Sequence, residues 1–125
     1  MAKSVLIIGE DPSLIDFDGP DVPEGISAET VMAGLNDSAD RLRARGCEAR
    51  ILLTKDEGTV EEQVVQALAQ ATYDVIVVGA GLRTLPPMAR QFEVLINVLH
   101  RQAPESRIAF NSQPDDSDQA AARWL

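Results

Sequence analysis

The sequence is poor in the residues that most often carry catalysis or cross-linking. Cys47 is the only cysteine among the 125 residues, so neither an internal disulfide nor a thiolate metal cluster can form within one chain. His100 is the only histidine, which leaves at most one imidazole as an acid or base near neutral pH. The chemistry of a site in this chain must therefore come from other side chains or from the backbone.

Long apolar runs are absent as well. No run approaches the ~20 residues that span a bilayer, and the first apolar run is shorter than the ~7–15-residue core of a signal peptide. Positive charge is also scarce, because 11 Lys and Arg residues stand against 20 Asp and Glu residues, a formal net charge of −9. Such a chain repels phosphate backbones and anionic lipids. We expect a cytoplasmic protein with neither nucleic acid nor membrane as a partner.

What the sequence does contain is a regular alternation of two patterns. Short apolar runs rich in β-branched residues predict buried strands at residues 5–8, 47–54, 74–78 and 107–111. Apolar residues at spacings of three and four predict helices over residues 27–45, from residue 59, over about 85–102, and near the end of the chain. The third strand is apolar on both faces, which is typical of a parallel sheet with helices on either side.

Four repeats of strand and helix predict an α/β fold. Right-handed crossovers favour a single domain over residues 1–125, a three-layer αβα sandwich of the flavodoxin-like or Rossmann-like kind. Its four-stranded parallel sheet is expected in the order 2-1-3-4.

Ligands of such sheets bind beyond the carboxyl ends of the strands, where the strand order reverses. Here that point lies between the first and third strands, and nine residues are candidate ligand contacts: Gly9, Glu10, Gly79, Ala80, Gly81, Arg83, Thr84, Asn111 and Ser112. The two glycines of the third-strand turn free backbone donors, Thr84 is placed to cap the next helix, and Arg83 adds a cation. This arrangement attracts a carboxylate or phosphate. A plain strand-to-helix turn, with Arg83 paired to a nearby acid, would have the same sequence.

The long segment at residues 10–26 has no periodicity and is rich in acids and prolines. Connections of this length are commonly functional, and this one could close as a lid. Glu10 and Asp11, together with Asp56 after the second strand, are oxygen donors that could hold Mg²⁺. A merely solvated loop is the alternative.

A second copy of the chain is a possible partner. Val94 and Val98 fall beside the polar face of the third long helix, where another subunit could cover them. The last strand also leaves a sheet edge that needs protection. Both features predict a homodimer.

Two resemblances bear on the fold. The run VLIIGEDP resembles the start of response-regulator receiver domains, whose first strand ends in acids that hold Mg²⁺; Glu10 and Asp11 match that pair, and Ser112 matches a Ser or Thr position. The family's phosphoacceptor position is Gly79, so the resemblance implies the fold without phosphorelay activity. The segments VGAGLR, FEVLINVLH and IAFNSQPDD are similar to small bacterial α/β proteins of unknown function, a likeness that implies no activity.

Three hypotheses follow from these patterns. The first is a small binding or regulatory module that recognises an anionic metabolite at the carboxyl ends of the strands. The second is a Mg²⁺-dependent hydrolase or phosphotransferase that uses the acids after the first strand. The third is a structural homodimer. Whether the protein is an enzyme stays open at this point.

Overall fold

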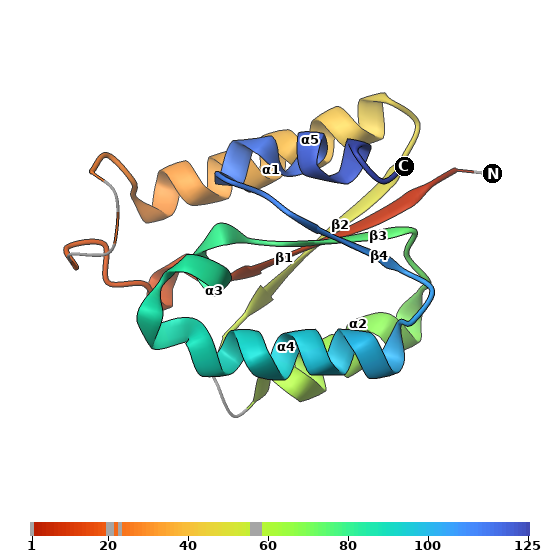
Figure 1. The fold of residues 1–125 in the computed structure, drawn as a ribbon. Coiled ribbons are helices and arrows are strands. Elements are labelled where there is room, and N and C mark those ends of the chain that lie inside the picture. The colour runs from red at the N-terminus through yellow and green to blue at the C-terminus, as the bar shows by residue number, and fades with distance from the viewer. Residues whose placement is uncertain (1, 20–21, 23, 56–58) are drawn as a thin grey trace.

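The computed structural model describes residues 2–19, 22, 24–55 and 59–125. Four strands form one parallel sheet in the order β2-β1-β3-β4 (Figure 1). Their bounds are Ser4–Glu10 for β1, Glu48–Thr54 for β2, Val75–Val78 for β3 and Arg107–Phe110 for β4. The predicted α/β class, parallel sheet and strand order are confirmed.

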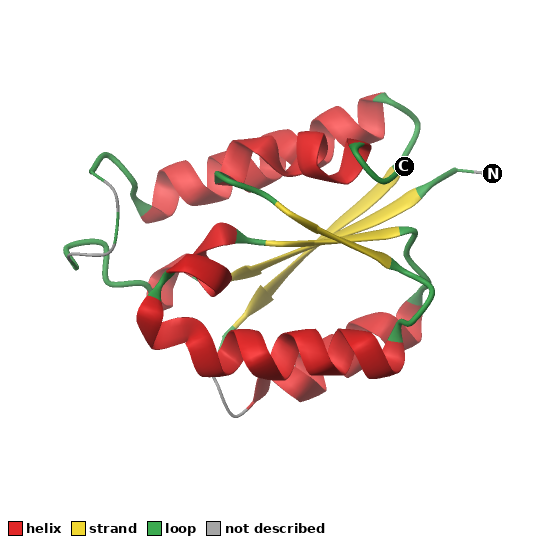
Figure 2. Cartoon of the chain, in the orientation of Figure 1, coloured by secondary structure: helices red, strands yellow, loops and turns green. Residues whose placement is uncertain are grey.

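Helices cover both faces of this sheet (Figure 2). Helices α1 (Ala28–Ala44) and α5 (Ser117–Ala122) lie on one face, and α2 (Val60–Gln70) and α4 (Ala89–Gln102) on the other. The result is the predicted three-layer flavodoxin-like sandwich. Shorter pieces connect these elements, among them the helix α3 (Ala80–Thr84) and the 3₁₀ turns η1 (Pro12–Leu14), η3 (Pro86–Met88) and η4 (Pro114–Asp116). In the described part of the chain, no helix combines the length and apolarity needed to cross a membrane.

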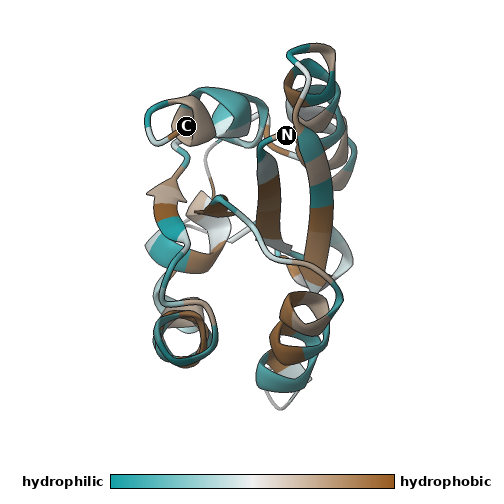
Figure 3. Cartoon of the chain, turned by 90° about the vertical axis from the view of Figure 1, so that its right-hand side faces the viewer, coloured by the Kyte–Doolittle hydropathy of each residue, from teal (hydrophilic) through white to brown (hydrophobic). Residues whose placement is uncertain are grey.

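The two faces of the sheet pack against separate apolar clusters, because successive strand residues point to opposite sides. Leu6 and Ile8 of β1 belong to the cluster under α2 and α4, whereas Val5 and Ile7 belong to the cluster under α1. All four residues of β3 are fully buried. Figure 3 shows the apolar colouring concentrated on the strands, between the helix layers.

Helix α1 has the ends that its sequence predicts. The Ser27 hydroxyl accepts a hydrogen bond from the Thr30 backbone N–H, and the Thr30 hydroxyl oxygen accepts one from the Ser27 backbone N–H. This reciprocal pair satisfies donors that the first helical turn leaves free. Past the other end, Gly46 has φ +88°, the left-handed conformation that a glycine adopts without strain.

The third long helix differs from its prediction. A helix from about residue 85, capped by Thr84, was expected; instead α3 starts at Ala80, directly after Gly79, and α4 starts only at Ala89. The Thr84 hydroxyl donates to the Ala80 carbonyl at 2.8 Å and does not cap the next helix. Leu85 is extended because it precedes a proline, which disfavours the helical conformation and separates the two helices.

The apolar face of α4 is also wider than the sequence suggested. Val98 is 2% exposed and belongs to the core with Leu95 and Leu99, while Val94 packs against the same cluster. The chain itself therefore buries Val98 and partly covers Val94, so Val98 is not available to a second subunit. Strand β4 is still the last strand in the sheet order, and the homodimer stays a prediction.

Candidate functional site

A cleft of about 640 Å³ lies at the carboxyl ends of β1 and β3. These strands are neighbours in the sheet, and the strand order reverses between them. Helix α3 and the segment between β1 and α1 lie at this end of the molecule, while both chain termini lie at the other end (Figure 1). The volume falls within the range of roughly 300–1,000 Å³ that is typical of small-molecule sites.

The structure brings all nine candidate contacts together around this cleft. They come from the ends of three strands and from α3: Gly9, Glu10, Gly79, Ala80, Gly81, Arg83, Thr84, Asn111 and Ser112. Topology alone locates them, because parallel strands deliver their carboxyl ends to the same edge of a sheet. Their contact with a ligand stays a prediction.

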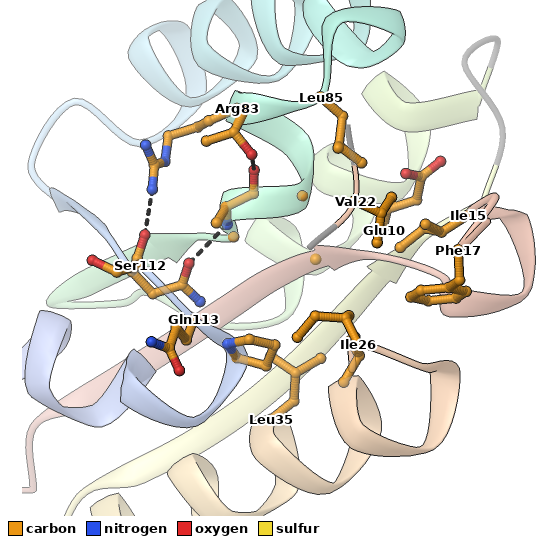
Figure 4. A pocket seen from close by; sticks show the side chains of 18 residues that line it. Glu10, Ile15, Phe17, Val22, Ile26, Leu35, Arg83, Leu85, Ser112 and Gln113 are labelled. Carbon is orange, nitrogen blue, oxygen red and sulfur yellow. Dashed lines mark hydrogen bonds between the residues drawn. The ribbon is translucent and has the colours of Figure 1, made fainter. Parts of the chain in front are cut away.

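The cleft also has an apolar wall that was not predicted from the sequence. Ile15, Phe17, Val22 and Ile26 line it from the segment between β1 and α1 (Figure 4). The remaining lining residues come from α1, from the linker after α3 and from η4 with the residue before it: Val31, Leu35, Leu85, Gln113 and Pro114. The signal for the first group was four apolar residues spread through an otherwise acidic segment.

Two acids that flank Phe17 in the same segment face water. Asp16 and Asp18 are exposed, and one Asp16 carboxylate oxygen accepts the Asp18 backbone N–H at 3.1 Å. Phe17, between them, lines the cleft. The segment thus presents Phe17 to the cleft while the two acids beside it point to solvent.

The two glycines of the β3–α3 turn differ in their surroundings. A Cβ added to Gly79 would lie 3.2 Å from the Ile8 carbonyl oxygen, which also accepts the Gly79 N–H at 2.8 Å. Close packing on β1 therefore explains Gly79. A Cβ added to Gly81 meets no atom within 4 Å, although Gly81 lies inside α3, where glycine costs about 1 kcal/mol relative to alanine. The missing side chain of Gly81 leaves room in the cleft.

Asn111 connects this turn to the last strand and helix. The residue is 2% exposed, and its side-chain oxygen accepts the Ala80 N–H at 2.7 Å. Its side-chain nitrogen donates to the Ser117 hydroxyl at 2.8 Å. The first backbone donor of α3 is thus already used within the protein, and Asn111 positions the cleft wall rather than presenting a free amide.

Arg83 is held on the β4 side of the cleft. Its Nη2 donates to the Asn111 carbonyl, and its guanidinium carbon lies 4.9 Å from the centre of the Phe110 ring. Its Nε is buried and makes no hydrogen bond within the described residues. In Figure 4 the guanidinium points toward Ser112 and away from Leu85 and Phe17. No acid among the described residues forms a salt bridge with Arg83, so the pairing considered as an alternative is not found there.

The two adjacent acids at the end of β1 have opposite environments. Glu10 is 8% exposed, and burial, followed by repulsion from Asp11, raises the pKa of its carboxyl group. No hydrogen bond or ion pair joins that carboxyl group to the described residues. The Asp11 carboxylate instead accepts the Ser13 N–H at 3.0 Å and the Ser13 hydroxyl at 2.8 Å, which lowers its pKa.

A magnesium site at these acids stays a prediction. Asp56, the third predicted ligand, lies outside the described residues. Within the described ranges, no three His, Cys, Asp or Glu side chains are grouped so that they could hold a metal ion. Asp11 is also engaged with Ser13, so Glu10 is the acid of this pair that the cleft presents.

Comparison with known proteins supports the fold alone. No family model matches the chain, and no curated protein matches it. Among solved structures, it is similar to a fragment of a "putative lipoprotein" from Peptoclostridium difficile 630, with a TM-score of 0.56. The two are 16% identical over 96% of this chain and 92% of the other. At this identity the likeness concerns the arrangement of strands and helices and carries no activity.

Proposed function

We propose that this chain is a small-molecule binding or regulatory module whose cleft at the carboxyl ends of β1 and β3 holds a ligand with a largely apolar body. The observation that carries this proposal is the wall formed by Ile15, Phe17, Val22 and Ile26 over the end of the sheet. Apolar surface that a ligand covers is worth about 25 cal/mol per Å². Sites of this kind combine apolar walls with a few polar groups that orient the ligand.

An anionic head group, as expected from the sequence, has less support than the apolar body. It would have to reach Arg83, whose guanidinium already donates to Asn111 and packs on Phe110. The net charge of −9 also opposes the approach of an anion. A ligand with an anionic head group is therefore the less favoured version of this proposal.

Binding of a neutral fluorescent probe tests the cleft. N-phenyl-1-naphthylamine should show saturable fluorescence enhancement with the wild-type protein. In Gly81→Phe, the new side chain starts in open space at the cleft, so affinity for the probe should fall at least about tenfold, which corresponds to about 1.4 kcal/mol.

Ala89→Phe is the matched control, because Ala89 is exposed at the start of α4 and does not line the cleft. It adds the same aromatic ring elsewhere and should leave probe affinity unchanged. Equal loss in both variants, or no loss in Gly81→Phe, would contradict a ligand site in this cleft.

Self-association through the sheet edge is a second candidate. Phe110 on the edge strand β4 is 41% exposed, and Trp124, whose ring centre lies 5.8 Å from the guanidinium carbon of Arg107 on the same strand, is 49% exposed. A second copy that paired with this edge would cover exposed apolar surface along β4. Sedimentation equilibrium at rising protein concentration should then show a dimer, and Phe110→Lys should shift the equilibrium to the monomer. A monomer at all concentrations would reject this candidate.

A further inference from the structure

Among the described residues, two acids are buried, and Glu10 differs from the other, Asp118, in that its carboxyl group has no partner there. Asp118 is 7% exposed, and its carboxylate accepts hydrogen bonds from Arg41 Nε at 3.1 Å and Nη2 at 3.0 Å. Glu10 is buried to the same degree, yet its carboxyl group bonds to none of the described residues. Partial burial without a hydrogen bond or counter-charge disfavours the charged form of the Glu10 carboxyl group, a cost that Arg41 offsets at Asp118.

The position of Glu10 shows where a partner could come from. The residue ends β1 and lines the cleft together with Ile15 and Leu85, which Figure 4 shows in the same part of the pocket. A ligand that filled the apolar part of the cleft would bring its own polar group within reach of this carboxyl. The unmet hydrogen-bonding capacity and the empty space thus belong to one site.

Charge decides which polar group fits. Asp11 follows Glu10 directly and repels it, and the net charge of the chain is −9. Arg83, the cation in the cleft lining, donates from Nη2 to the Asn111 carbonyl on the β4 side of the cleft, although its Nε makes no hydrogen bond within the described residues. Next to Glu10, a ligand group that donates hydrogen bonds and brings positive charge is therefore favoured over one that accepts them or is negative.

We propose that Glu10 binds the ammonium group of a primary amine whose apolar body occupies the cleft. This inference rests on the proposed function and adds the class of ligand. A neutral alcohol with the same body would gain only the apolar contacts, and a carboxylate would be repelled by Glu10 and Asp11.

Three ligands that share an eight-carbon chain and differ in their head group distinguish these cases: octylamine, octanol and octanoate. Each is titrated by calorimetry at neutral pH below its aggregation concentration. The wild-type protein should bind octylamine at least about tenfold more tightly than octanol, since a hydrogen bond to a charged group is worth about that ratio or more. Glu10→Gln keeps the size of the side chain and should remove this preference, leaving the affinity for octanol unchanged.

Asp18→Asn is the control, because it removes the same charge from an exposed acid of the neighbouring segment that does not line the cleft. It should keep the preference for the amine. Equal affinity for octylamine and octanol in the wild type, or a preference that survives in Glu10→Gln, overturns the inference and leaves the apolar cleft standing. Tightest binding of octanoate overturns it in favour of an anionic ligand at Arg83. Absence of binding by all three overturns the proposed function as well.

Discussion

The side-chain oxygen of Asn111 accepts the backbone N–H of Ala80 at 2.7 Å, across 31 positions of sequence. The same side chain donates to the Ser117 hydroxyl, which in turn donates to the Pro114 carbonyl at 3.2 Å. One buried amide thereby fixes the start of α3 relative to the end of β4 and the start of α5.

Asn111→Ala should lower the free energy of unfolding by about 1–3 kcal/mol, because it leaves the Ala80 N–H without its acceptor in a buried setting. Urea denaturation measures this change. Asn97→Ala is the control: Asn97 is exposed on α4 and donates only to the Glu93 carbonyl, so a change within about 0.5 kcal/mol is expected. Comparable losses in the two variants would show that Asn111 is not the connecting residue.

Two glycine-to-alanine substitutions should change the free energy of unfolding in opposite directions. A Cβ at Gly34 of α1 would lie 2.9 Å from both the Pro114 Cβ and the Asp115 backbone nitrogen, so Gly34→Ala forces α1 and η4 apart. A loss of about 1–3 kcal/mol is expected. Gly81→Ala meets open space inside α3 and should gain about 0.5–1 kcal/mol. Thermal and urea unfolding of both variants check the pair, and a stabilising Gly34→Ala would disprove the close packing.

Glu10→Gln should stabilise the protein at neutral pH. Because the pKa of Glu10 is raised in the folded state, mainly by burial and also by Asp11, the contribution of Glu10 to stability is greatest below the unfolded value of about 4.3 and is lost as pH rises through the folded pKa. Glutamine does not titrate, so the advantage of the variant should grow with pH. Among nearby charges, Asp11 adds repulsion, and Lys55 acts on Asp11. Urea unfolding between pH 4 and 8 measures the trend; a constant difference would contradict it.

Asp118 should have the opposite pH dependence. Its pKa is lowered, first by the hydrogen bonds from Arg41, so its contribution is present above the unfolded value of about 3.9 and is lost as pH falls through the folded pKa. Asp118→Asn should therefore be less stable than the wild type at pH 7 and approach it in acid. The same urea series tests this. A difference between variant and wild type that persisted at the lowest pH would rule out the ion pair as its cause.

Much of the fold was accessible from sequence because its signals are local. Ser27 and Gly46 mark the ends of α1 within a few residues of the helix itself, and the β-branched run after Asp74 could only be a buried strand. The start of α3 was not predicted because the contact that supports it is not local. Gly79 and Gly81 resemble a loop locally, whereas the hydrogen bond that supports the first turn comes from the distant Asn111.

The location of the candidate site was predictable from the sequence, but the apolar nature of its lining was not. Parallel strands bring Glu10 and Gly79 to one edge whatever their side chains are. In an irregular segment, however, apolar residues have no regular spacing. Nothing in the sequence therefore indicates that Phe17 points into the cleft while Asp16 and Asp18 point to solvent. The engagement of Arg83 was equally hidden, because its partners Phe110 and Asn111 follow 27 and 28 positions later.

The cleft wall joins residues that lie far apart in the sequence, from β1 and α1 on one side and from Asn111 through Pro114 on the other. Gly34 allows these two parts to pack directly, since a Cβ there would lie 2.9 Å from the Pro114 Cβ. During translation, a nascent chain that has not yet reached Asn111 contains the residues of β1 to β3 but lacks one wall of the cleft. The proposed ligand site is therefore complete only after residues 111–114 have been synthesised.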